Sequence, residues 1–324
     1  MFHALKEKIK GKGTRIVFTG GSDQRVIEAA IRLKKENILE PILLGNREEI
    51  LYAAKGKGFD VEGIELLDPK EYHSIDKMVK RVVELRRGKL DEKMAYEECL
   101  KPNFFGTMYV EMGYADGLLG GATYSTADTI RPALQLIRTK AGNSIVSSCF
   151  IMMKEGEETL VMGDCSINID PSADDLVEIT LQTAHTVRQF GIEPRIGLLS
   201  YSTLGSAKGT SVEKVKEAST RLKRMPLDFG VEGEVQFDCA VAPEVASLKA
   251  PNSTVAGKIN TFIFPNIDAG NIGYKIAARL GGYEAIGPIL QGLNAPINDL
   301  SRGCNAEEVY KMAIVTAAQK YMDI

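Results

Sequence analysis

The chain has 324 residues, a length typical of two domains rather than one core. Hydrophobic residues make up 44%, charged residues 26%, and the formal net charge is -3, a balance that argues against a nucleic-acid-binding protein. No apolar run approaches the roughly 20 residues that a membrane-spanning helix needs, and the first stretch, M-F-H-A-L-K-E-K-I-K, has no secretory apolar region. We therefore expect a cytoplasmic protein that neither enters the membrane nor binds nucleic acid.

The first part of the chain alternates between short apolar runs and amphipathic segments. Residues 14–19 (T-R-I-V-F-T) predict a buried strand, followed by a G-G turn and a helix that Ser22 can cap. Further strands are predicted at 41–44, 64–67 and 115–119. Helices are predicted from Asn46, over most of 71–112 with a break near Pro102, and over 126–138.

The pattern changes after residue 140, because two consecutive strands, 144–153 and 159–162, flank the turn K-E-G-E-E and indicate a hairpin. Later segments predict strands at 196–200, 235–241, 261–264 and 287–291, and helices at 173–190 and from Asn305 to about residue 321. Alternating β and α units indicate mostly parallel sheets covered by helices on both faces. We expect two α/β domains, the first formed by residues 1–141 and 288–324 and the second by 142–287.

The five cysteines and three histidines are too scattered for a disulfide framework or a zinc site. The cysteine count is odd, no C-x-x-C motif occurs, and no histidine lies near another histidine or a cysteine at metal-ligand spacing. We expect reduced thiols, most of them in the core, and no metal site.

Polar residues gather where predicted strands end, and loops at such positions often carry binding groups. Residues 120–132 (G-G-A-T-Y-S-T-A-D-T-I-R-P) follow a strand and open a helix. The hydroxyls of Ser125, Thr126 and Thr129 therefore either help to bind a phosphate or carboxylate or serve as ordinary helix caps. Residues 200–209 are likewise either an anion-binding loop or a plain surface loop.

The last such loop, residues 298–308, places a hydroxyl, a guanidinium and a carboxylate within a few positions. Arg302 can hold an oxyanion in a bidentate fork. Glu308 stands three residues after Asn305, the spacing of a capping box, so it is either a helix cap or a general base. Cys304 has no histidine nearby in the sequence, and we expect it to be chemically inert.

Several stretches closely resemble phosphotransacetylases. The longest are residues 262–281 (F-I-F-P-N-I-D-A-G-N-I-G-Y-K-I-A-A-R-L-G) and 287–304 (G-P-I-L-Q-G-L-N-A-P-I-N-D-L-S-R-G-C), and the resemblance extends over residues 14–318. It implies a homodimer of chains with two α/β domains, an active site in the interdomain cleft, and a fold similar to isocitrate and isopropylmalate dehydrogenases. It also implies the reaction acetyl-CoA + phosphate = acetyl phosphate + CoA, with no tightly bound cofactor.

The same resemblance implies roles for particular residues. Ser301 and Arg302 match the catalytic serine and arginine of the family, and Glu308 matches the proposed base, which is often aspartate in relatives. Arg86 and Arg131 match arginines associated with the phosphates of CoA, although Arg86 also ends a predicted helix, where a cation offsets the macrodipole. We expect direct acyl transfer in a ternary complex, with the CoA thiolate attacking acetyl phosphate.

Three alternatives remain at this point. Phosphate butyryltransferases are a related but poorer match. An NAD-dependent decarboxylating dehydrogenase on a similar fold would need metal-binding carboxylates, and the sequence shows neither such a cluster nor a G-x-G-x-x-G motif. A non-catalytic acetyl-CoA-sensing module is disfavoured because Ser301, Arg302 and a carboxylate at position 308 are all present.

Overall fold

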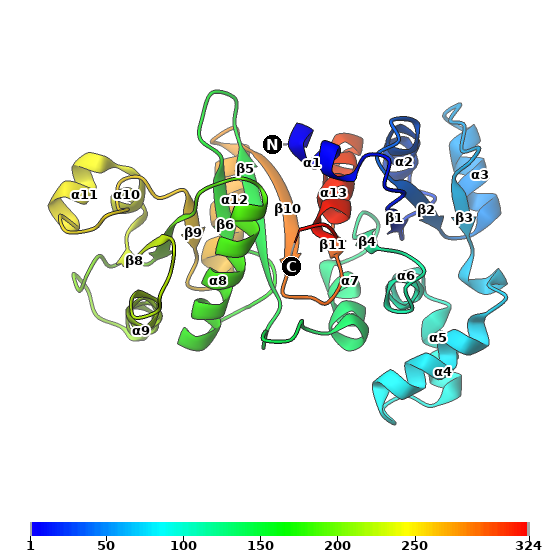
Figure 1. The fold of residues 1–324 in the computed structure, drawn as a ribbon, viewed down its shortest axis with the longest axis horizontal. Helices are drawn as coiled ribbons and strands as arrows, with labels where there is room; N and C mark the ends of the chain where they lie inside the picture. The colour runs from blue at the N-terminus through cyan, green and yellow to red at the C-terminus, as the bar shows by residue number, and fades with distance from the viewer. Residues whose placement is uncertain (1, 323–324) are drawn as a thin grey trace. The chain divides into compact units, whose positions relative to one another are not determined.

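The structure is a computed structural model that describes residues 2–322. It divides into two compact units, Met1–Gly142 with Leu293–Ile324, and Asn143–Gly292. Figure 1 shows the chain from blue at its N-terminus to red at its C-terminus. Within residues 2–322, no helix combines the length and the apolar character needed to cross a bilayer.

The first unit contains a five-stranded sheet in the order β11-β4-β1-β2-β3, in which every pair is parallel. Its strands are β1 (Arg15–Phe18), β2 (Glu40–Leu44), β3 (Glu65–Leu67), β4 (Gly117–Gly120) and β11 (Ile297–Asp299). Four of these were predicted, but β11 was missed, because residues 298–308 were interpreted as one loop. The first residues of that loop are in fact paired with β4.

Helices cover both faces of this sheet. The helices of this unit are α1 (Phe2–Ile9), α2 (Gln24–Lys35), α3 (Arg47–Lys55), α4 (Ile75–Arg86), α5 (Glu92–Cys99), α6 (Pro102–Glu111), α7 (Thr126–Pro132) and α13 (Ala306–Gln319), with a short 3-10 helix η1 (Pro69–Glu71) and a short π-helix η2 (Ala133–Ile137). Side chains alternate along a strand, so Ile16 and Val17 of β1 point to opposite faces. Gly106 of α6 packs against Val17, whereas α13 lies on the other face, where Thr316 and Ile16 both approach Gly117. The predicted sandwich of helices around a parallel sheet is confirmed.

The second unit contains a six-stranded mixed sheet in the order β10-β5-β6-β9-β7-β8. Its strands are β5 (Ser147–Met153), β6 (Leu160–Gly163), β7 (Arg195–Leu199), β8 (Gly230–Val235), β9 (Thr261–Ile263) and β10 (Glu284–Gln291). Its helices are α8 (Ala173–Gln189), α9 (Thr210–Lys223), α10 (Phe237–Val241), α11 (Pro243–Lys249) and α12 (Ile267–Arg279). The predicted hairpin is present, because β5 and β6 pair antiparallel.

Two sequence-based boundaries need correction. The strand predicted at 235–241 is wrong beyond its first residue, because β8 ends at Val235 and the rest forms α10. Cys239 of this helix is buried against Ala246 and Ala250, which the helical conformation makes possible. The return to the first unit was predicted at residue 288 and occurs instead at Leu293, because β10 pairs with β5 in the second unit.

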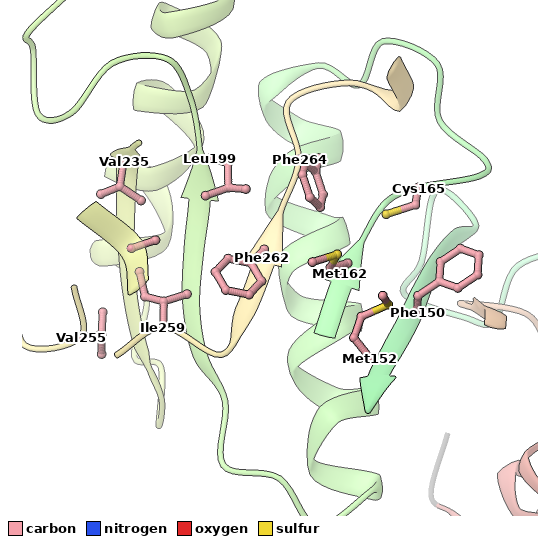
Figure 2. Close-up of a cluster of buried hydrophobic side chains, with 11 residues drawn as sticks. Phe150, Met152, Met162, Cys165, Leu199, Val235, Val255, Ile259, Phe262 and Phe264 are labelled. Carbon is pink, nitrogen blue, oxygen red and sulfur yellow. The ribbon is translucent and has the colours of Figure 1, made fainter. Parts of the chain in front are cut away.

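The second unit has a hydrophobic cluster on each face of its sheet, one around Phe262 and the other around Leu198 and Ile263. Figure 2 shows Phe262 of β9 between Leu199 of β7 and Met162 of β6, with Phe150 and Met152 of β5 continuing the cluster. These side chains are at most 8% exposed. All five cysteines are buried and unpaired, as expected for core thiols. Residues 200–209 are not a free surface loop, because the buried carboxylate of Glu234 accepts hydrogen bonds from Ser202 and the Gly205 amide.

Candidate active site

The candidate site lies at the carboxyl edge of the sheet in the first unit. All strands there are parallel, so the loops that follow β1, β2, β3, β4 and β11 meet at this edge. In the sheet, β2 and β3 lie on one side of β1, and β4 and β11 lie on its other side, so the order of the strands reverses at β1. Open α/β sheets bind ligands at such a reversal of strand order, outside the carboxyl ends of the strands.

A cavity of about 700 Å³ occupies this edge. The turn after β1 (Thr19 to Ser22), the turns after β2 and β3, and Tyr124 and Asp128 after β4 all line it. A smaller cavity of about 90 Å³ is lined by Arg131 and shares Lys101, Asn103 and Asp128 with the larger one. The predicted loop 120–132 therefore borders both cavities, which is the position expected of a substrate-binding loop.

Ser301 and Arg302 form an exposed turn directly after β11. The Ser301 hydroxyl oxygen accepts a hydrogen bond from the Gly303 amide at 3.2 Å, and its carbonyl accepts one from the Cys304 amide at 3.0 Å. Because the hydroxyl accepts from the backbone, its proton remains available to a ligand. Among the described residues, the Arg302 guanidinium has no hydrogen-bond or ion-pair partner, so it is free to bind an anion.

Glu308 occupies the first turn of α13, and the predicted capping box with Asn305 is present. The Glu308 amide donates to Asn305 Oδ1 at 2.9 Å, and the Asn305 amide donates to Glu308 Oε2 at 3.2 Å. The cap engages one carboxylate oxygen of Glu308. The other oxygen has no partner in residues 2–322, so the cap does not use up the carboxylate.

Arg86 is the last residue of α4, as the macrodipole interpretation required. However, its Nε is buried and lacks a hydrogen-bond partner in the described structure. A buried donor without a partner is costly. Arg138 donates a hydrogen bond of 2.5 Å to the carbonyl of Leu85 and so holds the end of α4 that carries Arg86.

The three hydroxyls predicted to bind substrate have internal acceptors in this structure. Ser125 donates to Asp128 at 2.7 Å, Thr126 donates to Asp299 at 2.7 Å, and Thr129 donates to Asp299 at 2.6 Å. An anion would meet the proton of such a hydroxyl only if the group turned away from its carboxylate. A role of these hydroxyls in binding substrate stays a prediction, whereas their role in shaping the loop is seen directly.

Asp299 is the residue of this edge that sequence reasoning missed. It is 1% exposed, and burial raises the pKa of its carboxyl group to about 6 even though two hydroxyls donate to it. Its only signal in the sequence is a charged residue at the end of the short apolar run before Ser301. Among the described residues, no group of three or more His, Cys, Asp or Glu side chains is arranged to hold a metal ion.

A parallel sheet whose carboxyl edge carries cavities, an exposed hydroxyl and unpaired guanidinium groups defines an α/β protein suited to anionic ligands. The family model described as phosphate acetyl/butaryl transferase matches residues 1–317, and the chain belongs to this family.

Individual relatives support this assignment over the full length. The phosphate acetyltransferase of Bacillus subtilis (strain 168) is 50% identical over 319 residues, which cover 98% of each chain. The crystal structure of a phosphotransacetylase from Streptococcus pyogenes matches with a TM-score of 0.94 and 51% identity, covering 99% of this chain and 98% of that chain. A 4-hydroxythreonine-4-phosphate dehydrogenase from Klebsiella pneumoniae matches with a TM-score of 0.55, over 95% of this chain and 99% of that chain. At 10% identity this is a likeness of fold alone.

Proposed function

We propose that this chain is a phosphate acetyltransferase that catalyses the reversible reaction acetyl-CoA + phosphate = acetyl phosphate + CoA. The observation that carries the proposal is 50% identity, over 98% of both chains, to a protein with that name. Relatives with 45–50% identity share the name, so an acetyl group is favoured over a butyryl group.

Arg302 is proposed to bind the phosphoryl oxygens of acetyl phosphate and to stabilise the departing phosphate. The support is its exposure at the carboxyl edge and its lack of a partner among the described residues. A guanidinium forms two parallel hydrogen bonds with a phosphate, which gives both charge and orientation. Removing one such transition-state contact costs roughly 100- to 1000-fold in rate.

Ser301 is proposed to donate a hydrogen bond from its hydroxyl group to the CoA thiol sulfur or to the oxyanion that develops on the acetyl carbonyl. The support is the Gly303 amide, which occupies an acceptor site of the Ser301 oxygen and leaves the proton unassigned. Glu308 is proposed to accept the thiol proton through its free carboxylate oxygen. The thiolate that remains is the more reactive nucleophile and attacks the acetyl carbonyl.

Arg86 and Arg131 are proposed to bind the phosphates of CoA. Arg86 has a buried Nε without a partner, and Arg131 is exposed at the smaller cavity. Ser125 caps α7, Thr126 and Thr129 lie on α7 together with Arg131, and these three residues are proposed to complete the binding surface. CoA then acts as a substrate, and no tightly bound cofactor is needed for this chemistry.

Transfer is proposed to be direct, within a ternary complex of CoA, acetyl phosphate and enzyme. Cys304, the alternative nucleophile, is 5% exposed, and burial raises the pKa of its thiol. A buried thiol in its protonated form is a poor nucleophile, so an acetyl-cysteine intermediate is disfavoured.

A homodimer is proposed from an exposed apolar stripe that runs along α12 to its C-cap residue in the second unit. Ile272, Ile276 and Leu280 follow one another at four-residue spacing and are 58%, 54% and 85% exposed. A second copy of the chain would bury them. Light scattering should give twice the mass of the chain, and Ile276→Glu should shift it toward the monomer.

A cytoplasmic location is proposed because all five thiols are unpaired, which suits a reducing compartment.

The decisive experiment measures acetyl-CoA formation from acetyl phosphate and CoA, with butyryl phosphate as a parallel substrate. Acetyl-CoA formed faster than butyryl-CoA supports the proposal, whereas a faster butyryl reaction would reassign the substrate. NADH formation from NAD and a hydroxy acid in the presence of Mg²⁺ would favour the dehydrogenase alternative. Binding of acetyl-CoA without any turnover would favour the sensing module.

A further inference from the structure

Arg25 is the second residue of α2, and its side chain donates hydrogen bonds to three separate segments around the candidate site. All five N–H groups of its guanidinium have acceptors. Nε and one Nη2 proton go to Asp23, at 2.9 and 2.8 Å. The other Nη2 proton goes to the carbonyl of Ala122 at 2.9 Å, in the loop after β4.

The two Nη1 protons reach the turn after β11. One donates to the carbonyl of Arg302 at 2.8 Å and the other to the carbonyl of Cys304 at 2.7 Å. These carbonyls flank Gly303, so one planar group grips the backbone on both sides of the turn that carries Ser301 and Arg302. The turn has few other restraints, because residues 301–303 are exposed and the internal bonds described for it are those from the Gly303 and Cys304 amides to Ser301.

We propose that Arg25 is a positioning residue for the acetyl-transfer reaction, which holds the Ser301–Arg302 turn and the loop after β4 in a fixed mutual arrangement. The inference rests on the proposed roles of Ser301 and Arg302. Arg25 touches neither substrate in this proposal and acts through the backbone of the turn.

The charge of Arg25 is not what the site uses. Asp23 forms an ion pair of 2.8 Å with it, and hydrogen bonds from Arg25 hold the pKa of the Asp23 carboxyl group below its usual value. The pair is therefore close to neutral as a unit, and Arg302 remains the cation of the turn. Asp23 also caps α2 by accepting a hydrogen bond from the Arg25 amide at 2.9 Å, in place of the predicted cap Ser22. The contact of Arg25 with the two carbonyls of the turn, called the clamp below, is therefore built on the N-terminus of a helix.

Shape thus matters more than charge at position 25. A lysine keeps the positive charge but offers three donors in a tetrahedral arrangement, and it cannot reproduce the planar fork that reaches both carbonyls. A misplacement of about 1 Å at a reacting group can cost on the order of 100-fold in rate, so we expect kcat to fall roughly 10- to 100-fold in Arg25→Lys and Arg25→Met.

Arg32 provides the matched control on the same helix. It is also an arginine that reaches α13, through Glu307, and it pairs with Glu36, but it does not touch the turn. Arg32→Gln should leave kcat within about twofold of the original chain, in line with the small effect of surface ion pairs. Thermal unfolding of all three variants separates a loss of fold from a loss of positioning.

A double-mutant cycle tests whether Arg25 acts through Arg302. In an Arg302→Ala background, Arg25→Met should cost clearly less than in the original chain, because one of the two side chains that Arg25 positions is already gone. Guanidinium ion at millimolar concentration should raise the activity of Arg25→Ala, and an equal ionic strength of NaCl should not. Full additivity in the cycle would overturn the proposal.

Hydrogen exchange tests the clamp without any assay of activity. The amides of Gly303 and Cys304 should exchange faster in Arg25→Met than in the original chain. Their exchange rates should not change in Arg32→Gln. Unchanged exchange in Arg25→Met would refute the clamp. An original chain without acetyltransferase activity would refute the proposed function, whereas the exchange result would still decide whether Arg25 restrains the turn.

Discussion

Asp299 gives a stability prediction that follows from burial alone. Its carboxyl group is enclosed by Thr126, Thr129 and the loop after β4, where a Cβ on Gly121 would lie 2.2 Å from Asp299 Oδ1. Burial raises the pKa of this group from 3.8 to about 6. The difference of about 2 pKa units corresponds to about 3 kcal/mol.

The direction in which the free energy of unfolding changes with pH follows from proton uptake by Asp299. Between pH 4 and 6 the folded chain binds the Asp299 proton more tightly than the unfolded chain, so the free energy of unfolding falls as pH rises through this window. Above about pH 6 the folded chain carries a buried carboxylate at the full cost. Asp299→Asn keeps the shape and stays neutral. One Thr hydroxyl can turn to accept from the new amide nitrogen, and the other can keep donating to the remaining oxygen.

We therefore expect Asp299→Asn to gain stability relative to the original chain, by an amount that grows by about 3 kcal/mol from pH 4 to pH 7. Urea unfolding at a series of pH values measures it. Asp60→Asn, at an exposed aspartate of the same unit, is the control and should show no such trend. A difference that is constant with pH, or that grows as pH falls, would refute the reasoning.

Four further predictions concern catalysis. Arg302→Lys should lower kcat roughly 100-fold or more with the fold intact, since it loses the planar fork, and near-normal turnover would remove Arg302 from the mechanism. Arg86→Ala and Arg131→Ala should raise the KM for CoA more than that for acetyl phosphate, and equal effects would contradict their assignment to CoA. Cys304→Ala should keep substantial activity, whereas an acetylated Cys304 trapped by mass spectrometry would establish a ping-pong route. Glu308→Gln should melt within a few degrees of the original chain yet lose most of its turnover, with a smaller loss at high pH, where the CoA thiolate forms unaided.

The fold was predictable wherever apolar periodicity was strong, and the failures have local causes. β11 was missed because it reads I-N-D, with polar side chains where a buried strand usually has apolar ones. Their partners come from distant positions. Asn298 donates to Thr316 and Gln319 on α13, and Asp299 accepts from two threonines of α7. No local pattern announces such a strand, because its polar groups are satisfied only by the tertiary structure.

The opposite error arose at residues 235–241 (V-Q-F-D-C-A-V), where β-prone residues form a helix after Val235. Local preference there yields to packing against α11. At the site, the sequence indicated the turn at Ser301 and Arg302 and the cap at Asn305. It contained no signal for Arg25, because hydrogen bonds to backbone carbonyls do not depend on the residue types that carry those carbonyls and so produce no sequence motif.

The two interpretations of Glu308, cap or base, are compatible once the geometry is known. A carboxylate has two oxygens and about four acceptor sites, and the cap at Asn305 uses one of them through Oε2. That bond also fixes the side chain, so the second oxygen is held at the start of α13, a few residues after the exposed Ser301 and Arg302. A base is more effective when its orientation is set before the substrate arrives. The helix cap would then be the device that orients the base, which explains why a capping glutamate in this position can serve the stability of α13 and the chemistry of the turn together.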